Sequence, residues 1–151
     1  MTRADIVPVC VMEEAACAQP FHAWTEDNYR SSLGSGYWMR VMCTPEGEIV
    51  GVCVCMFGMQ ELHLLNLVVS SRWHRQGMAR WMLKRMTELC KAQRLAMIWL
   101  EVRPSNESAR QLYGSMGYEE ISLRRNYYPS LLGREDALVM KQEVPLDAPL
   151  D

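Results

Sequence analysis

The chain has 151 residues and a formal net charge of -2, so it is the size of one domain and long enough to bury a substantial core. Hydrophobic residues make up 49% of it and charged residues 23%, a globular balance that excludes a disordered chain or a coiled coil. The mild acidity argues against a protein that binds nucleic acid or an anionic membrane, so we expect neither partner.

Cysteine usage and the first residues indicate a reducing compartment. The six cysteines form no Cys-x-x-Cys pair and lie mostly in apolar runs, which is typical of buried thiols rather than of disulfides or a zinc site. Residues 1–20 hold a short apolar run interrupted by Pro8, Glu13 and Glu14, unlike a signal peptide or a membrane span. We therefore expect a cytoplasmic protein without a bound metal.

Two helices are predicted at the start of the chain. Asp5 can cap a helix that ends near Ala16, because Pro20 prevents its continuation. Thr25 can cap a second, short helix that stops at Gly34.

Three β-rich runs follow at hairpin spacing, over residues 37–43, 49–57 and 61–69, and predict an antiparallel meander. Residues 77–93 then place apolar side chains at three- and four-residue spacing, as in an amphipathic helix. The short apolar run "MIWLEV", residues 97–102, is typical of a strand buried on both faces after a crossover helix. The sheet should therefore change to parallel pairing at its centre.

The C-terminal part is predicted to add a helix and two strands. Asn106 can cap a helix that closes at Gly117. Two last strands, over residues 122–128 and 136–142, are expected on either side of a polar loop over residues 129–135.

The order of these elements predicts an α/β fold with a mixed sheet, in which an antiparallel meander precedes a central parallel βαβ pair. No linker and no repeat interrupts the sequence, so we expect a single domain over residues 1–143. Residues 144–151 carry little apolar surface and are expected to form a flexible tail.

The stretch "SSRWHRQGMARW", residues 70–81, places Gly77 at the start of a predicted helix, after a strand and a polar turn. Unpaired N–H groups at a helix N-terminus favour an anion, and a glycine lets a phosphate approach closely. The alternative is a tight turn with the arginines as a solvated rim. No P-loop and no dinucleotide-binding pattern is present, so the spacing alone leaves both interpretations open.

The segments "RQGMAR", "IWLEVRPSNESARQLYGSMGY", "RRNYYP" and "GREDALVM" together resemble the GNAT acetyltransferases, and within them the ribosomal-protein-alanine N-acetyltransferases. The resemblance runs from about Tyr37 to Gln142. It implies the acyl-coenzyme A N-acyltransferase fold, in which two parallel strands splay apart to form a cleft for acetyl-coenzyme A as co-substrate.

The resemblance also implies which residues bind this cofactor. The family signature Arg/Gln-x-x-Gly-x-Gly/Ala maps onto His74, Gly77 and Ala79, with histidine in place of glutamine or arginine. Backbone N–H groups of the loop would hold the pyrophosphate whatever the side chains are, and the end of the third strand would pair with the pantetheine arm. The implied cofactor-binding residues are Leu67, Val68, Val69, Arg75, Gln76, Gly77, Met78, Ala79, Arg80 and Asn106.

The same resemblance assigns Glu101 as general base and Tyr113 as general acid. An α-amino group has a pKa of roughly 8 and must lose a proton before it attacks the thioester, and the departing thiolate must gain one. From the residues alone, Glu101 could instead pair with Arg103 or with an arginine of residues 122–128. Tyr113 could instead be a core aromatic on the apolar face of its helix.

Two aromatic loops resemble those that flank the peptide entrance of N-terminal acetyltransferases. One contains Phe21 and Trp24, the other Tyr127 and Tyr128, and all four are candidate substrate-binding residues. Simple loop packing is the alternative for Phe21 and Trp24.

The acceptor implied by the resemblance is the N-terminal alanine of a basic ribosomal protein, the eighteenth of the small subunit. Glu135 and Asp136 could meet its basic side chains. The expected function is direct acetyl transfer from acetyl-coenzyme A to a protein N-terminus by a monomeric enzyme. Two alternatives stay open, the same catalyst acting on a small amine or a lysine side chain, and a non-catalytic acyl-coenzyme A-binding module.

Overall fold

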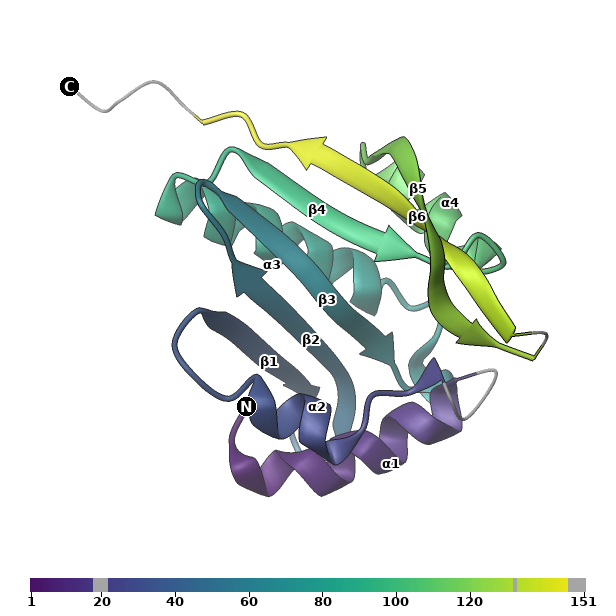
Figure 1. Cartoon of the computed structure of the whole chain (residues 1–151). Helices are drawn as coiled ribbons and strands as arrows, with labels where there is room; N and C mark the ends of the chain where they lie inside the picture. The colour runs from purple at the N-terminus through teal and green to yellow at the C-terminus, as the bar shows by residue number, and fades with distance from the viewer. Residues whose placement is uncertain (18–21, 132, 147–151) are drawn as a thin grey trace. The chain divides into compact units, whose positions relative to one another are not determined.

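The computed structural model describes residues 1–17, 22–131 and 133–146 (Figure 1). Within this part of the chain, six strands form a mixed sheet in the order β1-β2-β3-β4-β6-β5, which confirms the predicted fold class and order of elements. None of the described helices is long and apolar enough to cross a bilayer. The main elements are α1 (Ile6–Ala16), α2 (Glu26–Ser31), β1 (Tyr37–Cys43), β2 (Ile49–Phe57), β3 (Glu61–Val69), α3 (Met78–Gln93), β4 (Met97–Val102), α4 (Glu107–Ser115), β5 (Glu119–Ser130) and β6 (Gly133–Glu143), with short 3-10 helices η1 (Arg3–Asp5) and η3 (Ser71–Trp73).

The chain divides into two compact units. The first contains residues 1–56 and 65–79, and the second contains residues 57–64 and 80–151, so that β3 contributes to both. The single domain over residues 1–143 stays a prediction. The expected tail begins with Val144, which is buried and donates its N–H to the carbonyl of Ala96 at 2.8 Å.

The two helices of the first unit begin where the sequence predicts, although only one uses the expected cap. Thr25 Oγ1 accepts the N–H of Asn28 at 3.2 Å, and Asn28 Oδ1 accepts the N–H of Thr25 at 2.9 Å, which completes a capping box for α2. Asp5 stands at the N-cap of α1, but its carboxylate accepts the N–H of Thr2 at 2.7 Å and makes no side-chain cap bond.

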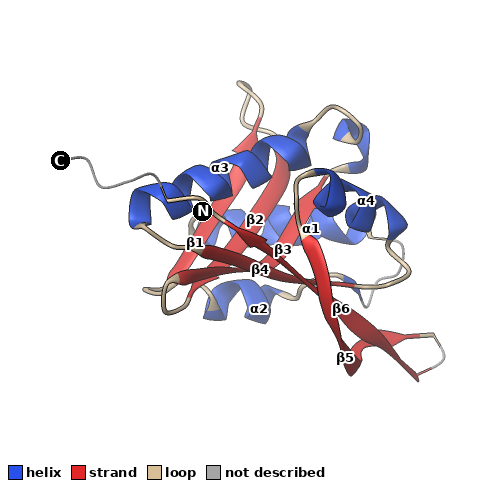
Figure 2. Cartoon of the chain, turned by 90° about the horizontal axis from the view of Figure 1, so that it is seen from above, coloured by secondary structure: helices blue, strands red, loops and turns tan. Residues whose placement is uncertain are grey.

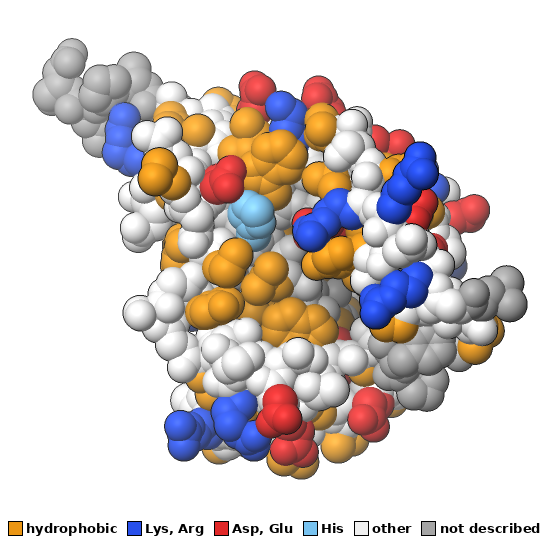
Figure 3. Space-filling view, viewed as in Figure 1, with side chains coloured by type: hydrophobic (Ala, Val, Ile, Leu, Met, Phe, Trp, Pro, Cys, Tyr) orange, Lys and Arg blue, Asp and Glu red, His pale blue; other side chains and the backbone are white. Residues whose placement is uncertain are grey.

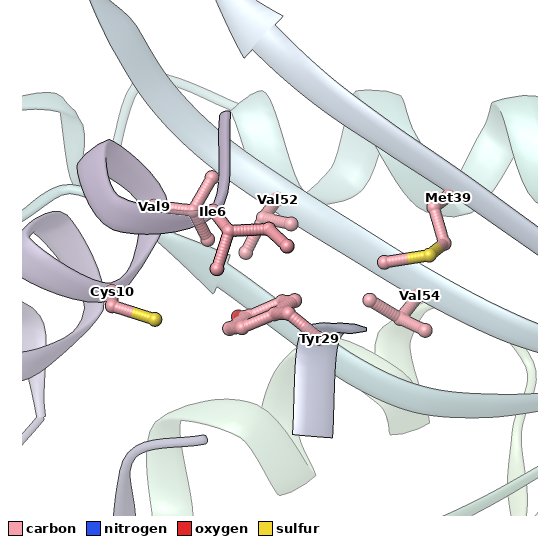
Figure 4. Close-up of a cluster of buried hydrophobic side chains, with 7 residues drawn as sticks. All are labelled: Ile6, Val9, Cys10, Tyr29, Met39, Val52 and Val54. Atoms are coloured by element: carbon pink, nitrogen blue, oxygen red, sulfur yellow. The ribbon is translucent and has the colours of Figure 1, made fainter. Parts of the chain in front are cut away.

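The core of the first unit forms where α1 and α2 pack on β1 and β2 (Figures 1 and 4). The cluster combines aliphatic, thiol and aromatic side chains from all four elements. β1 and β2 pair antiparallel, from Tyr37 opposite Met56 onward, as the meander requires. The buried members are Ile6, Val9, Cys10, Tyr29, Met39, Val52 and Val54.

The second unit is built on the parallel strand pair. Residues 61–64 of β3 pair parallel with residues 97–100 of β4, and β4 then pairs antiparallel with β6. β6 pairs with β5, and the two strands form a twisted ribbon (Figure 2). The apolar face of α3 is buried as the periodicity predicts, through Met82, Leu83, Met86 and Cys90.

The prediction of a polar loop over residues 129–135 is wrong. β5 extends to Ser130 and β6 begins at Gly133, with Pro129 opposite Arg134 and Ser130 opposite Gly133. Proline and glycine suggested a loop, but β5 is an edge strand, and an edge strand tolerates a proline where the missing N–H would face away from the neighbouring strand. The two strands therefore form a tight hairpin.

Leu83 provides a test of the core. It is fully buried on α3, whereas the adjacent Lys84 is exposed. We expect Leu83→Ala to lower the free energy of unfolding by about 3 kcal/mol, because it removes buried methyl groups and leaves a cavity. Lys84→Ala should change it by less than about 0.5 kcal/mol. Urea denaturation of both variants checks this, and equal effects would contradict the burial of this face.

Candidate functional site

The loop between β3 and α3 folds back on the end of β3. Its first residue, Ser70, donates its N–H to the carbonyl of Val50 at 2.8 Å. His74 Nε2 lies 2.7 Å from the carbonyl oxygen of Val69, and since a carbonyl only accepts, Nε2 carries the proton. The histidine at the family's glutamine or arginine position therefore braces the loop.

Two residues in the left-handed conformation shape the entrance to α3. Arg75 has a φ of 60° and Gly77 a φ of 78°. A Cβ at Gly77 would meet no heavy atom of the described chain within 4 Å, so this glycine faces open space. Successive N–H groups in such a turn, followed by the unpaired N–H groups of the first helical turn, form a concave surface that suits an anion. This backbone conformation would suit a phosphate, and the cofactor contacts of Arg75, Gln76, Gly77, Met78, Ala79 and Arg80 stay predictions.

The other predicted cofactor residues are divided between the two units. In the first unit, Leu67 and Val68 are half-buried on β3 and Val69 is buried. In the second unit, Asn106 Oδ1 accepts the N–H of Ala109 at 3.2 Å and caps α4. The cofactor contacts of these residues stay predictions.

Arg80 is anchored within the second unit. Its guanidinium donates to Ser115 Oγ at 2.9 Å and lies 3.0 Å from Met116 Sδ. These contacts hold the side chain against the C-terminal end of α4.

Glu101 stands on β4, one residue beyond the ladder with β3. Its Oε1 accepts from Arg124 Nη1 at 3.1 Å, and its side chain is 20% exposed while that of Arg124 is 54% exposed. The ion pair with an arginine of residues 122–128, considered above as an alternative, is thus present. The role as general base remains a prediction, and the half-exposed guanidinium can be displaced at little cost.

The environment of Tyr128, which includes Glu101 and Tyr113, raises the pKa of its hydroxyl group. Burial raises the pKa of Tyr128, the Glu101 carboxylate and the Tyr127 hydroxyl raise it further, the Arg103 guanidinium opposes them, and Tyr113 adds a smaller increase. The Tyr127 and Tyr128 rings are thus in contact, and Glu101 and Tyr113 lie close enough to influence Tyr128 electrostatically. Tyr128 stays protonated at neutral pH and can donate a hydrogen bond.

Arg103 holds the Tyr128 ring in place. Its guanidinium lies 4.4 Å from the centre of the Tyr128 ring, and Nη1 donates to the carbonyl of Pro129 at 2.6 Å. It also pairs with Glu135 at 3.5 Å, and Glu135 Oε1 accepts the N–H of Ser105 at 3.0 Å. Slight burial acts to raise the pKa of Glu135, but the bonds from Ser105 and the charge of Arg103 outweigh it and lower that pKa.

A bulge in β5 aims the two tyrosines. Arg124 pairs with Ala137 and Tyr128 with Glu135, so three residues of β5 face the single Asp136 of β6. Asn126 adopts a φ of 53°, and its N–H donates to Asp136 Oδ1 at 2.9 Å.

The bulge places the two rings edge to face, with their centres 4.8 Å apart. The Arg124 guanidinium lies 4.3 Å from the centre of the Tyr127 ring. Figure 3 shows basic side chains interspersed with acidic ones on the side of the molecule where β5 and β6 lie.

In the first unit, Trp24 is held by a buried carboxylate. Its N–H donates to Glu13 Oε1 at 3.0 Å, and its ring packs on Tyr29 with centres 5.2 Å apart. Burial raises the pKa of Glu13, against the hydrogen bonds from Tyr29, Trp24 and Asn66, which lower it. Phe21, which was predicted to lie in the same aromatic loop as Trp24, is outside the described residues.

Several of these features were missed from the sequence. Arg103 and Glu135 are 32 positions apart, and no local pattern links them. The bulge had one signal, an asparagine inside a strand-like run, because asparagine tolerates the left-handed conformation. Glu13 had one too, as an acidic residue among apolar neighbours on a predicted helix.

The arrangement in the second unit suits acid–base chemistry. A carboxylate at the end of β4 can accept a proton from an amine, and phenol groups beside it can donate protons or hydrogen bonds. Among the described residues, no group of three or more His, Cys, Asp or Glu side chains could hold a metal ion.

Comparison with known proteins gives the family. Residues 10–118 match the sequence profile of the Acetyltransferase (GNAT) family. The ribosomal protein bS18-alanine N-acetyltransferase of Escherichia coli K12 is 36% identical over 136 residues, which cover 90% of this chain and 89% of that protein. The protein of the same name from Salmonella typhimurium LT2 is 30% identical over 140 residues, 93% of this chain and 92% of that one.

Solved structures of related proteins have the same fold as this chain. The crystal structure of the Escherichia coli enzyme of that name matches with a TM-score of 0.87 at 30% identity, over 100% of this chain and 95% of that chain. Ard1 from Thermoplasma volcanium matches with a TM-score of 0.80 at 21% identity, over 96% of this chain and 95% of that chain, and shares the fold. Since the family profile and these relatives each span most of the sequence, the chain belongs to the GNAT family of acetyltransferases.

Proposed function

We propose that this protein transfers the acetyl group of acetyl-coenzyme A to the N-terminal amino group of a protein, and that its acceptor is the N-terminal alanine of ribosomal protein bS18. The observation that carries the proposal is the 36% identity, along 90% of the chain, with an enzyme named for that reaction. The surroundings of Tyr128 support it, because the candidate base and the candidate acid both influence the pKa of this tyrosine. A ribosomal acceptor implies a cytoplasmic enzyme, which we expect to act as a monomer.

Acetyl-coenzyme A is the acyl donor. In the proposed complex its pyrophosphate meets the backbone N–H groups of residues 75–80, and the open space at Gly77 admits it. Residues 67–69 of β3 would pair with the pantetheine arm as an added strand. The amide of Asn106 would contact the cofactor.

Gly77→Ala tests this loop. An alanine at a φ of 78° is strained, and its methyl group would enter the space proposed for the phosphate, so we expect the KM for acetyl-coenzyme A to rise about tenfold. The matched control is Gly36→Ala, because Gly36 has a φ of 91° and equally open surroundings. Both variants should lose similar thermal stability, and a raised KM in both would remove the specific role of Gly77.

Glu101 acts as the general base in the proposed mechanism. The carboxylate takes a proton from the acceptor ammonium, directly or through a water molecule, and the neutral amine attacks the thioester carbonyl. Arg124 binds Oε1, so the proton can go to Oε2, or to Oε1 once Arg124 has moved away.

Glu101→Gln should reduce kcat roughly 10²-fold near neutral pH and less at high pH, where the amine loses its proton without help. Affinity for acetyl-coenzyme A should stay unchanged, measured by isothermal calorimetry. Glu119→Gln, an exposed position on β5, serves as the control. A pH profile identical to that of the unaltered enzyme would exclude Glu101 as the base.

Tyr113 is the proposed general acid. It is buried on α4, with its ring centre 5.7 Å from that of Tyr118. When the tetrahedral intermediate collapses, the carbon–sulfur bond breaks, and the phenol would give its proton to the departing thiolate of coenzyme A. The nitrogen loses its second proton in the same stage, which leaves a neutral amide and restores the phenol.

Tyr113→Phe should lower kcat by about 10²-fold or more while the ring still fills its place in the core. Tyr118→Phe is the matched control, since it removes a hydroxyl from the neighbouring ring and should keep kcat within about twofold of the unaltered value. Steady-state kinetics at saturating substrates decide between the roles. Full activity of Tyr113→Phe would exclude Tyr113 as the general acid and leave it only a packing role.

The acceptor side of the proposal rests on Tyr127, Tyr128 and Trp24. The first two form an aromatic surface beside Glu101 that can flank an extended N-terminus. Glu135 and Asp136, which could meet basic acceptor side chains, also bond to Ser105, Arg103 and the Asn126 N–H within the chain. Their contact with the acceptor stays a prediction.

The deciding experiment incubates the protein with acetyl-coenzyme A and three peptides. One begins with Ala-Arg as an alanine-first basic N-terminus, one begins with Ser, and one has a blocked N-terminus and an internal lysine. We expect turnover of the first with the highest kcat/KM. Acetylation of the lysine peptide alone would overturn the N-terminal assignment, and tight cofactor binding without any turnover would favour a non-catalytic module.

A further inference from the structure

A carboxylate lies in the apolar core of the first unit. Glu13 is on α1, between the buried cluster and the segment that leads to α2, and its side chain is 1% exposed. The mechanism proposed above gives it no role. The groups that reach it are neutral donors, so its bonds must compensate for its removal from water.

Three donors from three segments converge on this carboxylate. Oε1 accepts the backbone N–H of Trp24 at 3.0 Å and the side-chain amide of Asn66 at 3.1 Å. Oε2 accepts the hydroxyl proton of Tyr29. The Asn66 amide also donates to the Tyr29 hydroxyl at 2.9 Å, so the polar groups form one closed network. The network joins α1, α2, β3 and the segment before α2.

Stability alone gives little reason for such a group, because an apolar side chain of similar size at a buried site is often as stable as a charged one. A buried carboxylate does, however, favour one particular arrangement of the groups around it. It stabilises only the arrangement in which its donors point at it, and a lost donor leaves a charge without compensation. At Glu13 this requirement fixes the Trp24 backbone, which lies outside any helix or strand.

The side chain of Trp24 is fixed as well as its backbone. The indole packs on the Tyr29 ring at 5.2 Å with an interplanar angle of 53°, and the hydroxyl of that same ring is bonded to Glu13. Backbone and ring of Trp24 thus depend on one carboxylate. Asn66 lies on β3, so the network also fixes the Trp24 segment to the sheet of the first unit.

We propose that Glu13 is a positioning residue for the acceptor, which fixes the place of the candidate acceptor-binding residue Trp24 and ties its segment to β3. The inference rests on the proposed function, since it takes Trp24 as an acceptor-binding residue. Glu13 touches neither substrate. Its contribution is to keep the loop in the bound arrangement before the acceptor arrives, so that binding does not have to order it.

The test compares Glu13→Gln with Glu14→Gln, the same chemical change at the next, exposed position of α1. In Glu13→Gln the amide has no charge for its three donors, and its NH2 group competes with the donor groups of Tyr29 and Asn66. We expect exchange of the Trp24 amide hydrogen to become about tenfold faster, as follows from loss of a charge-assisted hydrogen bond. The KM for the Ala-Arg peptide should rise by a similar factor.

Two quantities should stay unchanged in Glu13→Gln, the KM for acetyl-coenzyme A and kcat at saturating acceptor. Glu14→Gln should match the unaltered protein in every measurement. Unchanged exchange at Trp24, an unchanged acceptor KM, or an equal effect of Glu14→Gln would each overturn the proposal. A fall in kcat with no change in acceptor KM would also overturn it, because it would indicate general disturbance.

If Glu13→Gln does not fold, Tyr29→Phe decides, because it keeps the ring and removes only the hydroxyl donor. The expected result is again faster Trp24 exchange and a higher acceptor KM, and unaltered values of both overturn the proposal. Exchange is measured on the free protein and does not depend on the substrate assignment. If the enzyme acetylates a lysine or a small amine instead, the proposed function fails, and the acceptor KM is then measured with that amine, where an unchanged value overturns the role of Glu13.

Discussion

A four-residue parallel pairing, residues 61–64 of β3 against residues 97–100 of β4, is the constraint on which the second unit depends. Parallel ladders are slightly less stable per residue than antiparallel ones, and this ladder is short. Side chains reinforce it, since the Trp99 indole N–H donates to Glu61 Oε2 at 2.8 Å while Glu61 Oε1 lies 3.0 Å from His63 Nε2. Because Glu101 follows the last residue of β4 that pairs with β3, and itself pairs with Val139 of β6, the two ladders together determine where the candidate base stands.

The candidate site is polar, and its rigidity comes from residues that we do not expect to react. Arg103 binds a backbone carbonyl, an aromatic face and a carboxylate at once, a combination that suits a planar guanidinium and that a lysine could not reproduce. Asp136 fixes the bulge through one backbone N–H, and Glu13 fixes Trp24 in the same way. Both units therefore use buried or half-buried carboxylates to hold backbone segments that lie outside regular pairing.

The regular elements could be predicted from the sequence because caps and hydrophobic period are local. Thr25 and Asn106 cap the helices that they were predicted to cap, and the strands of the meander begin and end at the predicted residues. The hairpin loop was misjudged, because the tolerance of an edge strand for Pro129 depends on which strands neighbour it. For Glu101 the residues alone allowed an ion pair or a base. The ion pair with Arg124 is present in the free chain. It does not test whether Glu101 acts as a base when acetyl-coenzyme A and the acceptor are bound.

β5 is the outermost strand on its side of the sheet, twelve residues long and exposed along nearly its whole length. A flat edge of this length, with apolar residues such as Leu123 on it, would offer unpaired backbone groups to strands of other molecules. Three features interrupt it, the adjacent charges of Arg124 and Arg125, the bulge at Asn126, and Pro129, which has no N–H to offer. The irregularities that aim the candidate acceptor tyrosines thus also protect the chain from edge-to-edge aggregation, so a straighter and more regular β5 would cost the protein solubility as well as its site.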